Sequence, residues 1–312
     1  MSGSSPLRFN HTRQPLMLSG LRDLFAHPPE GGEAPYAGVI CDVWGVLHDG
    51  VAPYPGTPDA LIRLRQHAGP VILLSNAPRP SESIIPQLTR FGYHSGPEGH
   101  FDRIITSGDA TRAAIASGAY GNVLLHIGPE RDMPLLEGLE IERASIHDSQ
   151  FALCTGLFDD ERETPVDYND LLRELLARKL PMLCANPDNV VMRGGKMIYC
   201  AGAVARAYAA MGGAVTFFGK PYPGVYRLCL DALGEMLGRA ARPERVLAIG
   251  DALSTDIAGG QAVNMPTLLV SGGIHQEELA LGETGVNLPA LKEACVKADV
   301  APPSAVIPRC IW

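Results

Sequence analysis

The stretch GVICDVWGVLHDG, residues 38–50, places the carboxylate of Asp42 directly after an apolar run and before a Trp-Gly pair. Val39 and Ile40 are β-branched, as is typical of a buried strand, and Gly45 marks a turn soon after it. Asp42 therefore ends a predicted strand, at the edge of a sheet. By itself, such an aspartate is equally consistent with a turn former or a helix cap.

The same pattern recurs along the chain. Short apolar runs that end in Gly, Asn, Asp or Ser alternate with longer helix-like stretches; these runs are residues 38–41, 71–74, 104–106, 215–218, 246–249 and 267–270. This alternation predicts an α/β fold, with a Rossmann-like parallel sheet covered by helices on both faces. Open sheets of this kind bind ligands at the carboxyl ends of their strands.

A second set of strands and helices lies in the middle of the chain. Strands are predicted at residues 123–127, 151–157, 181–185 and 190–200, and helices near 168–178 and 201–211. Connecting loops are usually about 2 to 6 residues long, so this segment cannot be a loop. We predict a discontinuous core of residues 36–118 and 214–312, an inserted α/β cap domain of residues 119–213, and an N-terminal arm of residues 1–35. The tail from about residue 288 is expected to pack on the core as a strap.

Composition excludes several classes of protein. The 312 residues carry 26 Lys and Arg against 34 Asp and Glu, a net charge of −8, so there is no basic surplus for nucleic acid. No apolar run approaches the roughly 18 residues of a membrane helix, and the start lacks a signal-peptide pattern. Cytoplasmic localisation without membrane association is therefore expected. The seven cysteines include no C-x-x-C pair, which predicts neither a disulfide framework nor a zinc site.

Polar side chains gather at four predicted strand ends. In chain order these are Asp42; Ser75 and Asn76 in PVILLSNAPRP; Lys220 in AVTFFGKPYPG; and Asp251 and Asp256 in RVLAIGDALSTDIAGG. Taken singly, Ser75 or Asn76 could cap a helix, Asp256 could cap another, and Lys220 could be an ordinary surface lysine. A P-loop is excluded, because five residues separate Gly213 from Gly219 and Pro221 follows the lysine.

Together, these side chains predict a site for Mg²⁺ and phosphate. Carboxylates supply hard oxygen ligands, Lys220 offsets phosphoryl charge, and Ser75 with backbone amides holds the phosphate oxygens. Asp42 would then act as a nucleophile that forms an aspartyl-phosphate.

The chain resembles the haloacid dehalogenase superfamily of phosphotransferases, whose four motifs appear here in order. It is most similar to the branch with a large α/β cap between the second and third motifs, which includes 4-nitrophenyl phosphatases, pyridoxal phosphate phosphatase and ribonucleotide monophosphatases. The matching stretches are CDVWGVLHDGVAPYPG, LLSNAPRP, IITSGDAT, ANPD, CAGAVARAYAAMGG, FGKPYPGVY and IGDALSTDIAGGQAVNMPTLLVSGG. In the cap, Asn186–Asp188 matches the family pattern or forms a plain turn, and RGGK at residues 193–196 predicts a hairpin turn.

This resemblance implies a role for each matching residue. Asp42 is implied as nucleophile and Mg²⁺ ligand, with Asp251, Asp256 and the carbonyl of Trp44 completing the metal site. Ser75, Asn76, Gly45 and Lys220 are implied to bind phosphate. The implied substrate is a small phosphorylated metabolite, and capped relatives suggest a homodimer formed through the cap.

Trp44 departs from the family pattern. The resemblance implies a second aspartate at this position, which protonates the leaving group, and tryptophan cannot transfer that proton. General acid–base help is typically worth about 10² to 10⁴ in rate. His48 or Asp49 could supply the proton, or the substrate could have a good leaving group. Two alternatives stay open: a protein that binds phosphorylated metabolites without cleaving them, and a phosphotransferase.

Overall fold

The computed structural model describes residues 14–26, 34–279 and 286–312. The chain forms two compact units, and we describe each by itself. Unit 1 comprises Met1–Leu74, Leu88–Ile105 and Tyr226–Trp312, and unit 2 comprises Ser75–Gln87 and Thr106–Val225.

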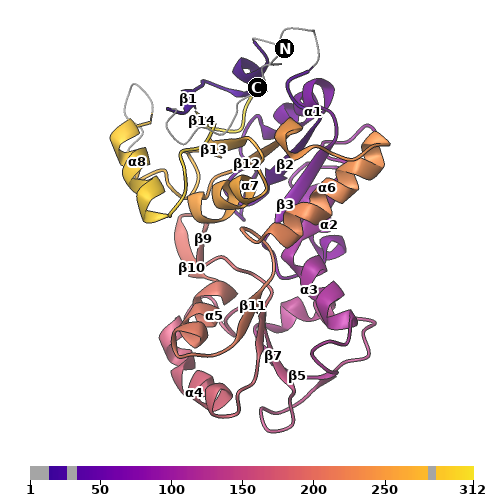
Figure 1. Ribbon diagram of the computed structural model, residues 1–312, viewed down its shortest axis with the longest axis vertical. Coiled ribbons are helices and arrows are strands. Elements are labelled where there is room, and N and C mark those ends of the chain that lie inside the picture. The colour runs from indigo at the N-terminus through magenta and orange to yellow at the C-terminus, as the bar shows by residue number, and fades with distance from the viewer. Residues whose placement is uncertain (1–13, 27–33, 280–285) are drawn as a thin grey trace. The chain divides into compact units, whose positions relative to one another are not determined.

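A seven-stranded sheet, in the order β1-β14-β13-β12-β2-β3-β4, forms the centre of unit 1 (Figure 1). Its strands are β1 (Leu16–Met17), β2 (Gly38–Asp42), β3 (Val71–Ser75), β4 (Arg103–Thr106), β12 (Val246–Gly250), β13 (Thr267–Val270) and β14 (Ala305–Ile307). The pairings from β1 through to β3 are parallel. Every residue of β2, β3 and β12 is buried, which explains why these strands read as continuous apolar runs.

Helices flank the sheet of unit 1. They are η1 (Leu21–Phe25), α1 (Thr57–Ala68), η4 (Pro243–Arg245), η5 (Leu253–Ile257), α7 (Ala258–Ala262), α8 (Leu288–Lys297) and most of α6 (Pro223–Leu237), while α2 (Ser81–Arg90) and the start of α6 run across the boundary of the two units. The α8 helix buries Leu291 and Cys295 in one cluster with Leu269 of β13 and Val306 of β14. These contacts, and the parallel strands, confirm the predicted α/β core.

Unit 2 has its own parallel sheet of five strands in the order β11-β8-β7-β5-β6. The strands are β5 (Val123–Ile127), β6 (Glu142–Arg143), β7 (Phe151–Cys154), β8 (Met182–Cys184) and β11 (Val215–Phe217). Outside this sheet, β9 (Val190–Arg193) and β10 (Lys196–Tyr199) pair antiparallel. Gly194 and Gly195 join them, both at positive φ, which confirms the hairpin turn predicted at RGGK.

Alternate residues of β7 pack into different layers of unit 2. Ala152 and Cys154 lie in a cluster with residues of α4 (Asn169–Ala177) and α5 (Ala201–Ala210). Phe151 and Leu153 lie in a second cluster with residues of α3 (Ser107–Ala116) and η2 (Glu130–Leu136). Because side chains alternate between the faces of a strand, helices cover both faces of this sheet. One further helical turn, η3 (Pro165–Tyr168), precedes α4.

One strand belongs to a different sheet from the one we predicted. Residues 215–218 were expected in the core sheet, but β11 pairs with β8 in unit 2, with Val215 opposite Met182. An apolar run shows that a strand exists but not which strand it pairs with, and that is the physical reason for the error. The domain boundaries near residues 118 and 213 stay a prediction.

The arm and the tail both extend the sheet of unit 1. The tail contributes β14, which pairs with β13 on one side and with β1 of the arm on the other, so the predicted strap is partly a strand. Residues 1–13 and 27–33 of the arm lie outside the described residues. In the described ranges, no helix has the length and apolar character needed to cross a membrane. All seven cysteines are buried and free.

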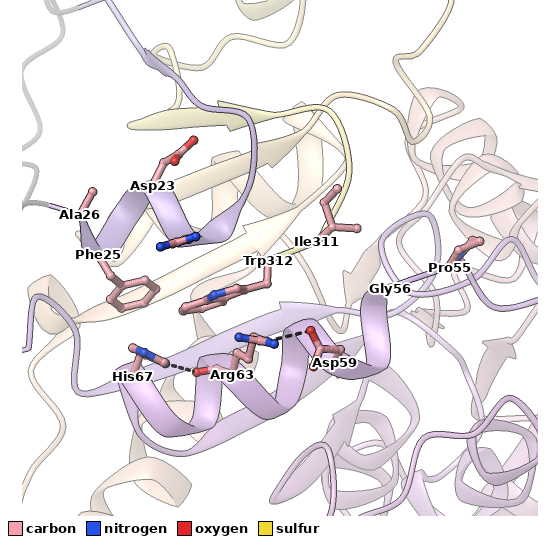
Figure 2. Close-up of a pocket in the computed structure, with 11 residues that line it drawn as sticks. Asp23, Phe25, Ala26, Pro55, Gly56, Asp59, Arg63, His67, Ile311 and Trp312 are labelled. Atoms are coloured by element: carbon pink, nitrogen blue, oxygen red, sulfur yellow. Dashed lines mark hydrogen bonds and ion pairs between the residues drawn. The ribbon is translucent and has the colours of Figure 1, made fainter.

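Aromatic side chains join the arm and the tail to α1. The rings of Phe25 and Trp312 stack with centroids 5.5 Å apart, and His67 of α1 lies 4.5 Å from Trp312. Figure 2 shows these rings beside Arg63 and Asp59, which form an ion pair along α1. They line an open pocket of about 1080 Å³.

We expect Trp312→Ala to lower the free energy of unfolding by about 2 kcal/mol, because it removes a large, partly buried ring from this cluster. Urea denaturation monitored by circular dichroism measures the change. Val296→Ala is the control: this side chain is 80% exposed, so its effect should stay within about 0.5 kcal/mol. Equal effects of the two substitutions would contradict the prediction.

Candidate active site

Three carboxylates meet at the carboxyl ends of two neighbouring strands. Asp42 ends β2 and Asp251 directly follows β12; the register of these strands pairs Cys41 with Ile249. Asp256 lies in η5, the helical turn after β12. One ligand atom from each of the three side chains lies within 4.8 Å of the others. The structure thus brings together, in unit 1, the three carboxylates that were predicted as metal ligands.

These carboxylates are only 7%, 5% and 4% exposed for Asp42, Asp251 and Asp256, respectively. Backbone amides orient two of them: Ile274 N donates to Asp251 Oδ2 at 2.7 Å, and Ala252 N donates to Asp256 Oδ2 at 3.1 Å. Three buried carboxylates this close repel one another, and a divalent cation would relieve the repulsion. Their hard oxygen atoms fit Mg²⁺, so the donor set is consistent with the predicted metal.

Glycines allow the backbone to approach Asp251. Gly45 has a φ of +85°, and a Cβ at this position would lie 2.0 Å from Asp251 Oδ2. At Gly273, a Cβ would lie 2.2 Å from the same oxygen. Any larger residue at either position would displace the carboxylate. Gly45 was predicted to bind phosphate. The structure shows in addition that a side chain at this position would clash with Asp251.

Trp44 and His48 pack together in the turn after β2. Their ring centroids lie 5.3 Å apart, and the His48 ring lies 5.0 Å from that of Phe91. His48 Nδ1 accepts a hydrogen bond from Gly50 N at 3.0 Å, and the His48 carbonyl accepts one from Gly45 N at 2.9 Å. Burial lowers the pKa of His48 to about 4, with Asp49 partly opposing the shift. At neutral pH the imidazole is therefore uncharged.

A second group of predicted site residues lies in unit 2. Lys220 N donates to Asn76 Oδ1 at 2.7 Å, and Asn76 Nδ2 donates in return to the Lys220 carbonyl at 3.2 Å. Asn76 and Lys220 are 4% and 3% exposed. Ser75 ends β3, and its Oγ accepts a hydrogen bond from Ala77 N at 3.2 Å. The structure thus joins two motifs that are 144 positions apart in the sequence.

Asp188 is a member of this group that we had not assigned to the site. Its Oδ1 accepts a 2.9 Å hydrogen bond from Asn76 Nδ2. Gly219, the residue before Lys220, has a φ of +110°, and a Cβ there would lie 2.5 Å from Asn76 Oδ1. The signal in the sequence was the Asn186–Asp188 tripeptide, which also fits a plain turn.

The carboxylates and the Asn76 group thus belong to different units. Asp42, Asp251 and Asp256 lie in unit 1, whereas Ser75, Asn76 and Lys220 lie in unit 2. Leu74, the residue before Ser75, pairs with Asp42 in the register of β3 and β2.

Two family models match this chain. One, described as haloacid dehalogenase-like hydrolase, matches residues 39–142, and the other, described as HAD-hydrolase-like, matches residues 217–294. Between them, these models include the acidic residues of unit 1 and the Asn76 group apart from Asp188.

A solved structure and two named relatives point to the same family as the two family models. A crystal structure of a hydrolase of the haloacid dehalogenase-like family from Brucella suis 1330 is 36% identical, with a TM-score of 0.78, and the match covers 93% of this chain and 98% of that one. The ribonucleotide monophosphatase NagD of Escherichia coli (strain K12) is 25% identical over 76% of this chain and 88% of NagD. A dihydroxyacetone phosphatase of Corynebacterium glutamicum (strain R) is 31% identical, but the match spans only 30% of this chain and 33% of that protein.

The predicted fold, the order of the motifs and a full-length relative above 30% identity all agree. The chain belongs to the haloacid dehalogenase-like hydrolases.

Proposed function

We propose that this protein is a Mg²⁺-dependent phosphatase that hydrolyses a small phosphorylated metabolite through an aspartyl-phosphate on Asp42. The observation that carries the proposal is the cluster of three buried carboxylates at the ends of β2 and β12. The names of two relatives, a ribonucleotide monophosphatase and a dihydroxyacetone phosphatase, support phosphate ester hydrolysis as the reaction.

In this mechanism, Asp42 is the nucleophile. A carboxylate oxygen of Asp42 attacks phosphorus, the bond to the leaving oxygen breaks, and the phosphoryl group passes to the aspartate. Water then attacks the aspartyl-phosphate, which releases inorganic phosphate and restores the carboxylate. Asp251, Asp256 and the Trp44 carbonyl would hold Mg²⁺ together with Asp42. When bound, Mg²⁺ offsets the negative charge that carboxylates and phosphate would otherwise bring together.

Ser75, Asn76 and Lys220 are proposed to bind the phosphoryl oxygens. The hydroxyl of Ser75 and the ammonium of Lys220 are suitable donors, and the lysine also offsets charge that develops during transfer. Asn76 would also position Lys220, because its side chain makes two hydrogen bonds to the Lys220 backbone. With its backbone fixed, Lys220 needs only side-chain adjustment when phosphate binds.

The leaving group restricts the choice of substrate. Trp44 cannot donate a proton, and His48 is a weak substitute because its ring is packed between Trp44 and Phe91 and is uncharged at neutral pH. We therefore favour substrates whose leaving group departs without protonation, such as aryl phosphates, acyl phosphates or phosphoanhydrides. Trp44 is also the observation that favours the second candidate, a protein that binds phosphorylated metabolites without turnover.

The nucleophile is tested by Asp42→Asn. With 4-nitrophenyl phosphate and Mg²⁺, we expect phosphate release to fall by at least about 10³-fold, because the amide cannot form the covalent intermediate. Asp59→Asn makes the same charge change at an exposed position on α1 and should retain activity. Undiminished release from Asp42→Asn would rule out the mechanism.

Trp44→Asp tests whether the protein lacks a general acid for the leaving group. It is assayed on 4-nitrophenyl phosphate and on ethyl phosphate. The wild type should hydrolyse the aryl ester far faster than the alkyl ester. The substitution should raise alkyl ester turnover by about 10² or more, since it supplies a proton donor. Equal wild-type rates on both esters would show that another residue donates the proton. No wild-type turnover on either ester would favour the binding protein.

The buried state of His48 is tested through pH. Its pKa is about 4 in the folded protein and about 6.5 when unfolded, so the unfolded chain binds more protons between these values. Stability should therefore be lost as pH falls through this window, by about 2.5 kcal/mol at pH 4.5 relative to pH 7. Urea denaturation of wild type and His48→Gln at both pH values isolates this contribution. An identical pH dependence in the two proteins would contradict the burial of His48.

A further inference from the structure

The backbone of Arg79 is anchored in unit 2. Arg79 lies in the loop of residues 77–80, between Asn76 and α2. Gly108 N donates to the Ala77 carbonyl at 3.0 Å, and Thr106 Oγ1 donates to the Arg79 carbonyl at 2.8 Å. Ser81 N donates to Asp109 Oδ1 at 2.9 Å. The loop is therefore fixed against the start of α3.

This loop follows the carboxyl edge of the unit 2 sheet. At one end, Asn76 contacts Asp188 and Lys220, which come after β8 and β11. At the other end, Arg79 faces Asp132, which comes after β5. The sheet order places β7 between β8 and β5. With strands about 4.8 Å apart and at most about 10 Å of chain between residues 76 and 79, the backbone of Asn76 and the backbone of Arg79 are separated by roughly 5 to 10 Å.

The guanidinium of Arg79 is only loosely paired. Its Nε lies 3.8 Å from Asp132 Oδ1, which is too long for a hydrogen bond, and its side chain is 30% exposed. Within the described part of the chain, this guanidinium donates no other hydrogen bond. A guanidinium has five N–H donors, and a half-buried one normally finds acceptors for them.

Neighbouring cations already have partners. Arg193 pairs with Asp160 at 3.0 Å, and Arg131 pairs with the same carboxylate. Burial lowers the pKa of Arg79, and the charges of Arg131 and Arg193 lower it further, while Asp132 opposes this. Burial also raises the pKa of Asp132 to about 6, so this carboxylate is itself poorly stabilised. Ion pairs connect seven charged side chains here. Four are cations (Arg79, Arg131, Arg193 and Lys196) and three are anions (Asp132, Asp160 and Glu161), which leaves one positive charge in excess.

We propose that Arg79 binds a carboxylate of the substrate, so that the preferred substrate is a phosphate monoester that also carries a carboxylate. This inference rests on the proposed function, because it takes Asn76 and Lys220 to mark the place of the phosphate. One excess positive charge matches a monoanion, and a planar guanidinium fits a carboxylate through two parallel hydrogen bonds. Asp132 would keep the unliganded guanidinium oriented without fully neutralising it.

The test uses two esters that differ in one charge, 4-carboxyphenyl phosphate and its uncharged analogue 4-carbamoylphenyl phosphate. For the full chain with Mg²⁺, the ratio of kcat/KM for the carboxylate to that for the amide should be about tenfold or more. Arg79→Gln should reduce this ratio to about one. Arg131→Gln is the matched control: it removes a neighbouring charge that is already paired with Asp160, and the ratio should persist.

Two results would overturn the inference while leaving the phosphatase proposal intact: equal wild-type turnover of both esters, or an equal fall of the ratio in Arg79→Gln and Arg131→Gln. If Arg79→Gln does not fold, as judged by thermal unfolding, Arg79→Lys takes its place and should lower the ratio at least about threefold, because it loses the planar fork.

Calorimetric titration of Asp42→Asn with the two esters separates this inference from the proposed function, since it needs no turnover. Tighter binding of the carboxylate ester by about tenfold, lost on adding Arg79→Gln, supports the role of Arg79 even if the wild type hydrolyses neither ester. Equal binding of the two esters overturns that role whatever the hydrolysis assay shows.

Discussion

Three carboxylates held within 4.8 Å of one another in a buried position are the feature on which the site of unit 1 depends. Burying charge is costly unless opposite charge or hydrogen bonds compensate. The parallel register of β2 and β12 brings Asp42 and Asp251 to the same edge, and the backbone amide of Ile274 helps to hold the second carboxylate. Gly45 and Gly273 provide the space, because a side chain at either position would overlap with Asp251. Strand register, glycine placement and metal chemistry therefore support one another here.

Much of this arrangement could be predicted from the sequence because it depends on local pattern. A β-branched run that stops at a polar residue specifies both a strand and the edge at which its last side chain lies. This was enough to bring Asp42 and Asp251 together. It was not enough to decide which sheet a strand joins. Residues 215–218 were predicted in the core sheet, whereas β11 pairs with β8 in unit 2. The strand β14 was missed as well: it is only three residues long, and the tail that contains it was predicted to be a strap.

Other parts of the site depend on contacts between residues far apart in the chain, and no local pattern encodes these. Asn76 meets Asp188 across 112 positions, and Arg79 meets Asp132 between two separate motifs. The first contact orients the predicted residue Asn76, and the second involves Arg79, which the sequence analysis did not assign to the site. The same holds for His48, whose packing against Phe91 and whose lowered pKa follow from burial that the turn sequence does not reveal.

The segment that follows β3 links the proposed phosphate site to the proposed choice of substrate. Ser75, the last residue of β3, and Asn76 are proposed to bind phosphate, and Arg79 lies three positions after Asn76 on a backbone held against the start of α3. Because that backbone is fixed, the fold sets the positions from which the two proposed anion-binding groups extend. A substrate that reaches both groups would gain affinity without a cost in loop ordering. In the proposed mechanism such positioning would be of particular value, because Trp44 cannot protonate the leaving group and catalysis would depend more heavily on placement of the phosphate.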